Sequence, residues 1–459
     1  MTFADRMFLN WVSETAMSAA FSSSVIWFAV FCLPMGICGY VNTFVSQYHG
    51  NNQPERIGPS VWQGIWIALI IAPLAIAIVP LAPWIFSFTE HSPDSTRQEI
   101  LYFQILCAGG PALMIATALS AFYSGRAKTW VVMLVDATVS CINLVLDYVL
   151  IFGYAGFPEM GIAGAGWATV TALWLKAFIY LMLFLRRENR TAFFTLAGAR
   201  LDRELFGRML YYGGPSGVQV LLDVSGFTVF IVFIGRVGQM ESAATTLAFS
   251  IASLAFMPIW GVSMAVMVLV GQHLGEDRDD LAAQVTWTSL HISLAYIGFI
   301  SMLYIFAPDL LLHGFFAGNT APLAEQETLR NMAANLLKIV AAYNLMDASF
   351  MIFVSAVKGA GDTRFVMLVS VLMGFLLAAL SWLTIDYWKL NIYGCWITVS
   401  VWVSAMGVIF LLRFLGGKWR SMRVIEPHVL DLSTAVDANL PPSENGEVAR
   451  TLAAESTCD

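Results

Sequence analysis

Five carboxylic acids lie inside otherwise apolar stretches of the sequence, and their side chains are the ones best placed to do chemistry. They are Asp5, Asp136, Asp147, Asp223 and Asp347. A carboxylate in the middle of a bilayer costs on the order of 2.5–3.5 kcal/mol on insertion scales, so each one needs a reason to be there. Such an acid can hold a proton near neutral pH or supply hard oxygen ligands to a small cation. Either property suits transport that is coupled to an ion gradient.

The acids at positions 147 and 347 have polar neighbours on the same helical face. Asn143 lies one turn before Asp147, and Tyr343 lies one turn before Asp347, with Asn344 between them. Residues four apart share one face of a helix. The oxygen-rich group around Asp347 favours a cation or proton site. For Asp147 we favour the same role, and a polar contact between packed helices is the alternative.

The surroundings of the other two candidate acids are sparser. Gln219 lies one turn before Asp223, which favours a functional polar patch there. Asp5 stands beside Arg6, so a simple ion pair near a helix end is the alternative to a functional role. We favour the functional interpretation for both acids.

Asp136 is the acid that we expect to be structural. At 1.5 Å per residue it lies about 10 Å along its span from the basic end of the molecule. Lys176, in the following span, lies about 15 Å from the same end by the same count. The similar depth predicts an ion pair between Asp136 and Lys176.

The elements that carry these residues must be membrane helices. The chain has 459 residues, of which 58% are hydrophobic and only 12% charged, against roughly 25% charged in a soluble domain. Continuous apolar stretches recur that are long enough to cross about 30 Å of hydrocarbon, and they do not alternate as β-barrel strands do. We therefore expect an all-α integral membrane protein with twelve transmembrane helices, at residues 1–13, 16–47, 60–88, 98–124, 129–154, 161–185, 207–235, 242–273, 283–307, 331–357, 364–386 and 391–415.

The first of these stretches is too short to span. Thirteen residues cover about 20 Å, less than the hydrocarbon thickness. We expect the first helix to be truncated at its N-terminus, with the natural start of the chain upstream.

Lys and Arg are concentrated in alternate loops, which predicts the orientation. One set of loops holds most of them, namely Arg56, Arg126, Lys128, Arg186, Arg187, Arg190, Arg200, Arg203, Arg208, Arg278, Lys358, Arg364, Arg413, Lys418, Arg420 and Arg423. This set is predicted to be cytoplasmic, together with the C-terminus. The polar tail at 416–459 is predicted to be largely disordered.

The two halves of the chain repeat each other in order. Three motifs recur six spans apart: Val45-Ser-Gln-Tyr-His-Gly50 as Val270-Gly-Gln-His-Leu-Gly275, Thr129-Trp-Val-Val-Met-Leu-Val135 as Thr363-Arg-Phe-Val-Met-Leu-Val369, and Trp167-Ala-Thr-Val170 as Trp396-Ile-Thr-Val399. An even offset gives both halves the same orientation, which is a parallel repeat about an axis along the membrane normal. The predicted organisation is an N-lobe at 1–185, an inter-lobe cytoplasmic loop at 186–206 and a C-lobe at 207–415.

Several function classes are disfavoured by what the sequence lacks. It contains no GxxxxGK[ST] nucleotide motif, no CxxC pair, and no clustered acid-base or nucleophile set at one interface. It also lacks a basic soluble domain that could bind nucleic acid. We expect neither an enzyme nor a cofactor beyond a coupling ion.

At several positions the chain resembles the multidrug and toxic compound extrusion (MATE) family, from Phe3 to about Arg413. The ordered motifs that carry the resemblance, besides the 45–50 and 270–275 pair, are Ala4-Asp-Arg-Met-Phe-Leu9, Asn143-Leu-Val-Leu-Asp-Tyr-Val-Leu-Ile-Phe-Gly153, Pro158-Glu-Met-Gly-Ile-Ala-Gly-Ala-Gly-Trp-Ala-Thr169, Gly213-Gly-Pro-Ser-Gly217 and Lys358-Gly-Ala-Gly-Asp-Thr363. The resemblance implies two six-helix lobes and export of amphipathic organic cations, driven by a sodium or proton gradient.

The resemblance also implies two alternative ion sites. The NorM-like branch of the family would place a site in the C-lobe, and Asp223, Tyr343 and Asp347 match its positions, including those of a Na⁺ site. The DinF-like branch would place one in the N-lobe, and Asp5, Asn143 and Asp147 match that pattern. Gln219, Asp223 and Asp347 are also the expected substrate-binding residues. The chain departs from the family where the first half of helix 1 should be, which bears on the N-lobe site.

The resulting prediction is a secondary active multidrug efflux antiporter, exchanging organic cations for Na⁺ or H⁺ by alternating access. We expect a monomer in the bacterial inner membrane. A lipid-linked oligosaccharide flippase of the same superfamily is the alternative, disfavoured because its anionic substrate would need a cationic cavity. A membrane enzyme is the third class.

Overall fold

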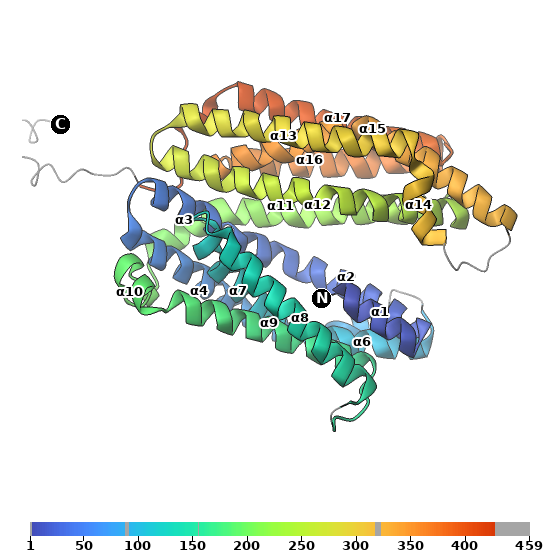
Figure 1. Cartoon of the computed structure of the whole chain (residues 1–459), viewed down its shortest axis with the longest axis horizontal. Coiled ribbons are helices and arrows are strands. Elements are labelled where there is room, and N and C mark those ends of the chain that lie inside the picture. Colours follow the sequence, from blue (N-terminus) through green and yellow to red (C-terminus); the bar gives the residue numbers. More distant parts are fainter. Residues whose placement is uncertain (1, 88–90, 155, 317–322, 427–459) are drawn as a thin grey trace, which may run out of the picture. The chain divides into compact units, whose positions relative to one another are not determined.

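The computed structural model describes residues 2–87, 91–154, 156–316 and 323–426. Met1–Val424 forms one compact unit, and Ile425–Asp459 is a second. Within the described residues there are helices and connecting turns and no strand (Figure 1). The prediction of an all-α protein is confirmed.

The helices follow one another with short connections. Those of the first half are α1 Thr2–Val12, α2 Glu14–Gly39, α3 Val41–Gly50, α4 Pro54–Ile78, α5 Ala82–Phe86, α6 Pro93–Cys107, α7 Gly110–Ser124, α8 Thr129–Phe152 and α9 Ile162–Phe184. Those that follow are α10 Arg187–Phe193, α11 Arg203–Gly235, α12 Gln239–Gly275, α13 Asp279–Phe306, α14 Pro308–Phe316, α15 Leu323–Ala360, α16 Thr363–Trp382 and α17 Ile392–Leu415. A π-helical turn, Leu383–Tyr387, extends α16.

Eleven of the twelve predicted spans correspond to helices of sufficient length. In the described part of the chain, ten continuous helical stretches are long and apolar enough to cross a membrane, and the pair α6 and α7 makes an eleventh, bent by 42°. The bend falls where Gly109 precedes Gly110 and Pro111, since proline cannot donate the helical hydrogen bond. The remaining helix, α1, has 11 residues, or about 16 Å of rise, which is too short to span. The chain is a multi-pass membrane protein.

Local sequence sets where several helices begin and end. Ser13 separates α1 from α2, and its hydroxyl accepts a hydrogen bond from Ala16 N at 3.0 Å, which caps α2. Gly153 ends α8 in the left-handed region at φ 72°, which favours glycine. These two breaks hold α1 and α8 in the positions that matter for the site described below.

Two glutamines join the first half of the chain to the second. Gln47 at the end of α3 donates from Nε2 to the carbonyl oxygen of Gly359 at 2.9 Å. Gln272 near the end of α12 donates from Nε2 to the carbonyl oxygen of Gly125 at 2.8 Å. The two glutamines are equivalent in the sequence repeat, so each half reaches across to a turn of the other in the same way.

Glycines allow α3 and α12 to approach closely enough for these bonds. A Cβ atom on Gly50 would collide with the carbonyl oxygen of Gln272, and one on Gly275 would collide with that of Gln47. Small residues commonly permit such close backbone contact between membrane helices. The repeated motif is therefore a packing motif between the two halves.

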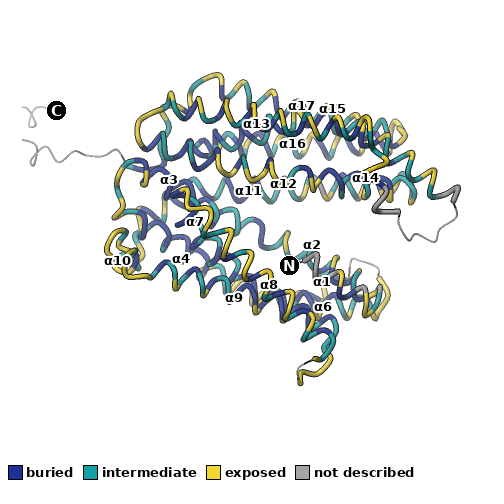
Figure 2. Tube along the Cα trace, viewed as in Figure 1, coloured by how far each residue is buried: buried dark blue, intermediate teal, exposed yellow. Residues whose placement is uncertain are grey.

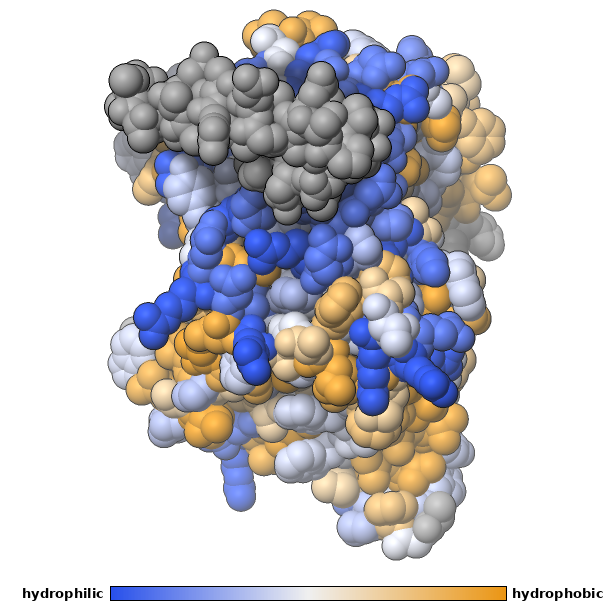
Figure 3. Space-filling view, turned by 90° about the vertical axis from the view of Figure 1, so that its left-hand side faces the viewer, coloured by the Kyte–Doolittle hydropathy of each residue, from blue (hydrophilic) through white to orange (hydrophobic). Residues whose placement is uncertain are grey.

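The loops that hold most of the Lys and Arg residues meet at this same end. Ion pairs connect several of them: Arg56–Asp202, Arg413–Asp362, Arg420–Asp279 and Arg423–Asp277. Hydrophilic side chains gather across the end of the molecule that carries α3 and α10 (Figure 3). One face thus collects the basic loops, as a positive-inside orientation requires; that this face is cytoplasmic stays a prediction.

The predicted inter-lobe loop is largely ordered. It contains α10 and a short 3-10 turn at Ala197–Ala199, and α11 already begins at Arg203. Two tryptophans of α4 hold it: Trp62 Nε1 donates to Thr195 O at 2.5 Å and Trp66 Nε1 to Ala199 O at 3.1 Å. The boundaries predicted for the two lobes stay a prediction.

The first residues of the predicted tail are also ordered. Trp419 lies in a 3-10 turn, Lys418–Ser421, and stacks on Phe414 with ring centroids 4.8 Å apart. Val424 N donates to Gln47 Oε1 at 2.8 Å. Residues 427–459, where we predicted disorder, lie outside the described residues.

Candidate ion and substrate sites

Four helices of the first half bring polar side chains to one enclosed point. Asp5 of α1 accepts hydrogen bonds at Oδ2 from Thr169 Oγ1 of α9 at 2.9 Å and from Tyr102 Oη of α6 at 3.4 Å. The carboxyl group of Asp147, on α8, lies close enough to the Asp5 carboxyl group for the two to interact electrostatically. Asp5 and Asp147 are 1% and 0% exposed, so the pair is closed off from solvent. Figure 2 shows the buried parts of the helices in dark blue. Sequence positions far apart therefore form one site.

Several polar atoms of this cluster are buried with no hydrogen-bond partner among the described residues. They are Asp5 Oδ1, Asn143 Oδ1 and Nδ2, and both carboxyl oxygens of Asp147. An unpartnered buried carboxylate is costly, and two adjacent ones repel each other. A proton shared by the two carboxyl groups would relieve this cost, and so would a small cation held by the four oxygen atoms. The cluster is chemically suited to bind one of the two.

Aromatic packing positions the helix that carries Asp5. Phe8, one turn after Asp5, lies with its ring centroid 6.0 Å from that of Tyr148 and 6.2 Å from that of Phe152, both on α8. Leu9 is fully buried in the same apolar cluster. These contacts dock α1 on α8, which places Asp5 opposite Asp147.

In the second half, α15 carries a polar group around Asp347. Asn344 is fully buried, and its Nδ2 donates to Ser301 Oγ of α13 at 3.2 Å, while its Oδ1 has no partner among the described residues. Tyr343 is 7% exposed and lies one turn before Asp347. Asp347 itself is half-buried and makes no hydrogen bond with another described residue. Its carboxylate is free to receive a ligand.

Asp223 lies apart from that group. Gln219 Nε2 donates to Asp223 Oδ2 at 3.1 Å, as their spacing on α11 suggested. Asp223 is exposed, and the Lys358 ammonium group lies within electrostatic range of it. No contact joins Asp223 to Asp347 in the described part of the structure. A single Na⁺ site formed by Asp223, Tyr343 and Asp347 stays a prediction.

Comparison with known proteins places this geometry in a family. The model of the MatE family matches residues 1–149 and 215–383, which is more than half of the chain. The chain belongs to the MATE family. The resemblance read from the sequence motifs is confirmed.

Relatives in the MATE family are similar along most of their length. The chain is 26% identical over 415 residues to the "Probable multidrug resistance protein NorM" of Xylella fastidiosa, covering 87% of this chain and 84% of that protein. It is also 26% identical over 373 residues to the "Multidrug resistance protein PmpM" of Pseudomonas aeruginosa, covering 81% and 76%.

Solved MATE structures share the fold. One is described as "Crystal structure of MATE in the bent conformation", with a TM-score of 0.81 and 16% identity, covering 91% of both chains. Another is an "Outward-facing conformation of a multidrug resistance MATE family transporter of the MOP superfamily", with a TM-score of 0.81 and 16% identity, covering 91% of this chain and 92% of the other. At this identity the likeness concerns the fold alone.

Two residues of the enclosed cluster were missed in the sequence of this MATE-family chain. Thr169 lies in the repeated Trp167-Ala-Thr-Val170 motif and ends the Pro158–Thr169 motif, and neither motif marked it as a site residue. Tyr102 lies in a segment without any motif. A tyrosine or threonine in an apolar span has an ordinary structural explanation, so only the packing reveals that both face Asp5.

The predicted ion pair between α8 and α9 is confirmed. Lys176 Nζ lies 2.9 Å from Asp136 Oδ1, and Tyr180 Oη donates to the same oxygen at 3.0 Å. Both charged groups thus have a partner. This supports the structural role expected for Asp136.

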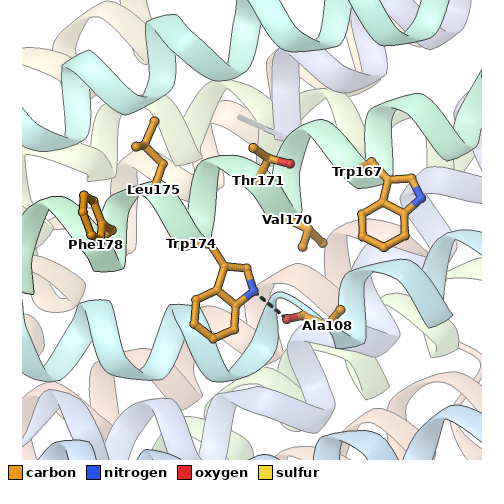
Figure 4. Close-up of a pocket in the computed structure, with 7 residues that line it drawn as sticks. All are labelled: Ala108, Trp167, Val170, Thr171, Trp174, Leu175 and Phe178. Carbon is orange, nitrogen blue, oxygen red and sulfur yellow. Dashed lines mark hydrogen bonds between the residues drawn. The ribbon is translucent and has the colours of Figure 1, made fainter. Parts of the chain in front are cut away.

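An aromatic groove lies along α9 on the outside of the helix bundle. It has a volume of about 520 Å³ and is lined by Ala108, Trp167, Val170, Thr171, Trp174, Leu175 and Phe178 (Figure 4). Trp174 Nε1 donates to Ala108 O at 3.1 Å, which fixes that ring at the edge of the groove. The lining contains no carboxylate, so it lacks the charge that an organic cation would need.

Proposed function

We propose that this chain is a multidrug efflux antiporter that exports amphipathic organic cations in exchange for Na⁺ or H⁺. The observation that carries the proposal is the enclosed cluster of Asp5, Asn143 and Asp147, with buried oxygen atoms that lack donors. The multidrug resistance proteins to which the chain is similar support the substrate class. Export would run outward across the inner membrane, with the basic loops and the C-terminus inside.

The enclosed cluster is the better candidate for the coupling ion. Its two acids are adjacent and closed to solvent, so occupancy by a proton or Na⁺ changes the local charge where no water can screen it. The hydroxyl groups of Thr169 and Tyr102 can donate a hydrogen bond to a carboxylate, and after rotation their oxygen atoms can coordinate a cation. A change of occupancy would alter how α1 packs on α8, which is a route from ion binding to helix movement.

The accessible acids of the second half are the better candidates for the drug. A cationic substrate with a large ring system needs apolar surface and a carboxylate. Asp347 has no hydrogen-bond partner among the described residues, and Asp223, held by Gln219, is exposed. Linkage between ion binding in one half and drug binding in the other would produce antiport, with each ligand lowering the affinity for the other.

Ion release on drug binding tests this function. Adding an organic cation such as ethidium to purified protein should release either H⁺, read with a pH-sensitive dye, or Na⁺, read with a sodium electrode. The Asp147→Asn variant should lose most of that release and keep its folding. Asp94→Asn, an exposed acid in the first turn of α6, is the matched control. Absence of release of both ions from the unaltered protein would refute antiport.

The alternative of a lipid-linked oligosaccharide flippase is tested by the same protein in vesicles. Transport of a labelled anionic lipid-linked sugar, with no gradient-dependent movement of any organic cation, would favour the flippase.

A further inference from the structure

Another buried acid, Glu99, lies on α6 one turn before Tyr102 of the enclosed cluster. The side chain of Glu99 on α6 is 1% exposed, and its Oε1 lies 2.8 Å from His91 Nδ1. Its Oε2 is buried without a hydrogen-bond partner among the described residues. Glu99 has no distinguishing feature in the sequence, because it lies at the polar end of a predicted span. Its burial needs an explanation, since an isolated contact at a helix end does not require an acid.

Polar groups continue from Glu99 to the Asp5 site. Glu99 and Tyr102 are three residues apart on α6, a spacing that places two side chains about 5–6 Å apart at Cβ on one face. Tyr102 donates in turn to Asp5. A gap of this size between two polar side chains is commonly bridged by one water molecule.

Serines of α2 line the same stretch. Ser23 is fully buried, and its hydroxyl donates to the backbone carbonyl oxygen of Glu99 at 2.9 Å. Ser24, the next residue of α2, donates from its hydroxyl to the backbone carbonyl oxygen of Ala20 at 2.6 Å. A polar side chain of α2 thus contacts α6 at Glu99, where an apolar side chain would be expected in a membrane span.

The outer end of this row reaches solvent. The His91 side chain is 47% exposed, whereas the Asp5–Asp147 pair is almost completely closed. The carboxyl group of Glu99 contacts His91, and Tyr102 lies three residues further along the same helix. A coupling ion that reaches the closed pair in this conformation needs a route, and this row is one.

We propose that His91, Glu99 and Tyr102 form a proton path from the aqueous end of α6 to the Asp5–Asp147 pair. The inference rests on the proposed antiport. His91 takes a proton from water at Nε2 and gives one from Nδ1 to Glu99 Oε1. The protonated carboxyl group of Glu99 then rotates, so that its O–H points toward Tyr102. It passes this proton, through one water, to the Tyr102 hydroxyl, and that hydroxyl releases its own proton to Asp5. One proton moves in each step, and no bond between heavy atoms forms or breaks.

The isosteric variant Glu99→Gln separates a path from a mere structural contact. A glutamine keeps the size of the side chain and can still accept a hydrogen bond from His91, but it cannot carry a proton. The rate of drug-induced proton release should fall at least about tenfold, while the number of protons released at equilibrium and the melting temperature stay close to those of the unaltered protein. Asp94→Asn, on the same helix but exposed, should leave the rate unchanged.

A second variant keeps the test decisive if Glu99→Gln folds poorly. His91→Gln alters an exposed residue and removes the group that would pass a proton to Glu99, so it should also slow proton release. Proton release at the unaltered rate in both variants, or a lowered melting temperature with an unaltered rate, would overturn the path.

The failure of this inference is distinguishable from failure of the antiport. An unaltered protein that releases Na⁺ and no H⁺ would overturn the proton path and leave antiport in place. Release of neither ion would remove both.

Discussion

Gln47 should be the strongest single contact that holds the two halves together at the basic end. Its amide makes two hydrogen bonds to the second half of the chain, from Nε2 to Gly359 O at 2.9 Å and from Val424 N to Oε1 at 2.8 Å. Each such bond contributes about 0.5–1.5 kcal/mol net. Gln47→Ala should therefore weaken the closed arrangement by about 1–3 kcal/mol, a shift of roughly 5- to 150-fold between closed and open forms.

Gln272→Ala provides an internal comparison of the same type. The equivalent glutamine of the repeat has one such bond, to Gly125 O at 2.8 Å. Its loss should shift the equilibrium by about half as much in free energy, or 0.5–1.5 kcal/mol. The effect of Gln47→Ala should be the larger one because Gln47 makes two hydrogen bonds to the other half and Gln272 makes one. The residue type is the same in both variants and cannot account for the difference.

Distances between spin labels would measure the shift. Lys128 and Arg278 are exposed and lie in turns of different halves at the basic end, so cysteines placed there, with the native cysteines replaced, report its opening. A second population at longer distance should grow in Gln47→Ala and, less, in Gln272→Ala. Unchanged distances in Gln47→Ala, or a larger effect in Gln272→Ala, would refute the idea that these hydrogen bonds stabilise the closed arrangement at this end.

Three further predictions concern single side chains. Neutralising Asp136 or Lys176 alone should lower the melting temperature, and neutralising both should be better tolerated; a double variant less stable than both single ones would contradict the structural role. Asp347→Asn should abolish drug-linked ion exchange at normal expression, and full transport by that variant would remove Asp347 from the mechanism. Arg126 lies between two phenylalanine rings at 3.6 and 4.3 Å, so Arg126→Lys should cost about 1–2 kcal/mol in unfolding experiments; an unaltered stability would show that charge alone matters there.

Much of the architecture follows from local sequence. Whether a stretch spans a membrane depends on about 20 neighbouring residues, so the apolar helices could be predicted with their approximate ends. The Asp136–Lys176 pair could be predicted for a similar reason. Helix rise per residue is fixed, so counting from one end gives the depth of both charges, and α8 and α9 are consecutive.

The meeting of side chains from distant helices could not be predicted in this way. Tyr102 and Thr169 face Asp5, and Glu99 faces His91, because α6 and α9 pack at a particular rotation against α1 and α2. Rotation depends on the shapes of all the side chains in the contact, and a sequence motif does not record it.

The five acids with which the sequence reasoning began show the same division. Their types and their apolar surroundings, fixed by the sequence alone, mark this chain as one that handles charge inside a membrane. The tertiary structure decided how they group: it brought Asp5 to Asp147, paired Asp136 with Lys176, and left Asp223 with Gln219 as its hydrogen-bond partner. The burial of an acid and the groups that it contacts depend on how the helices pack. They determine which acid can bind an ion and which one only stabilises the fold.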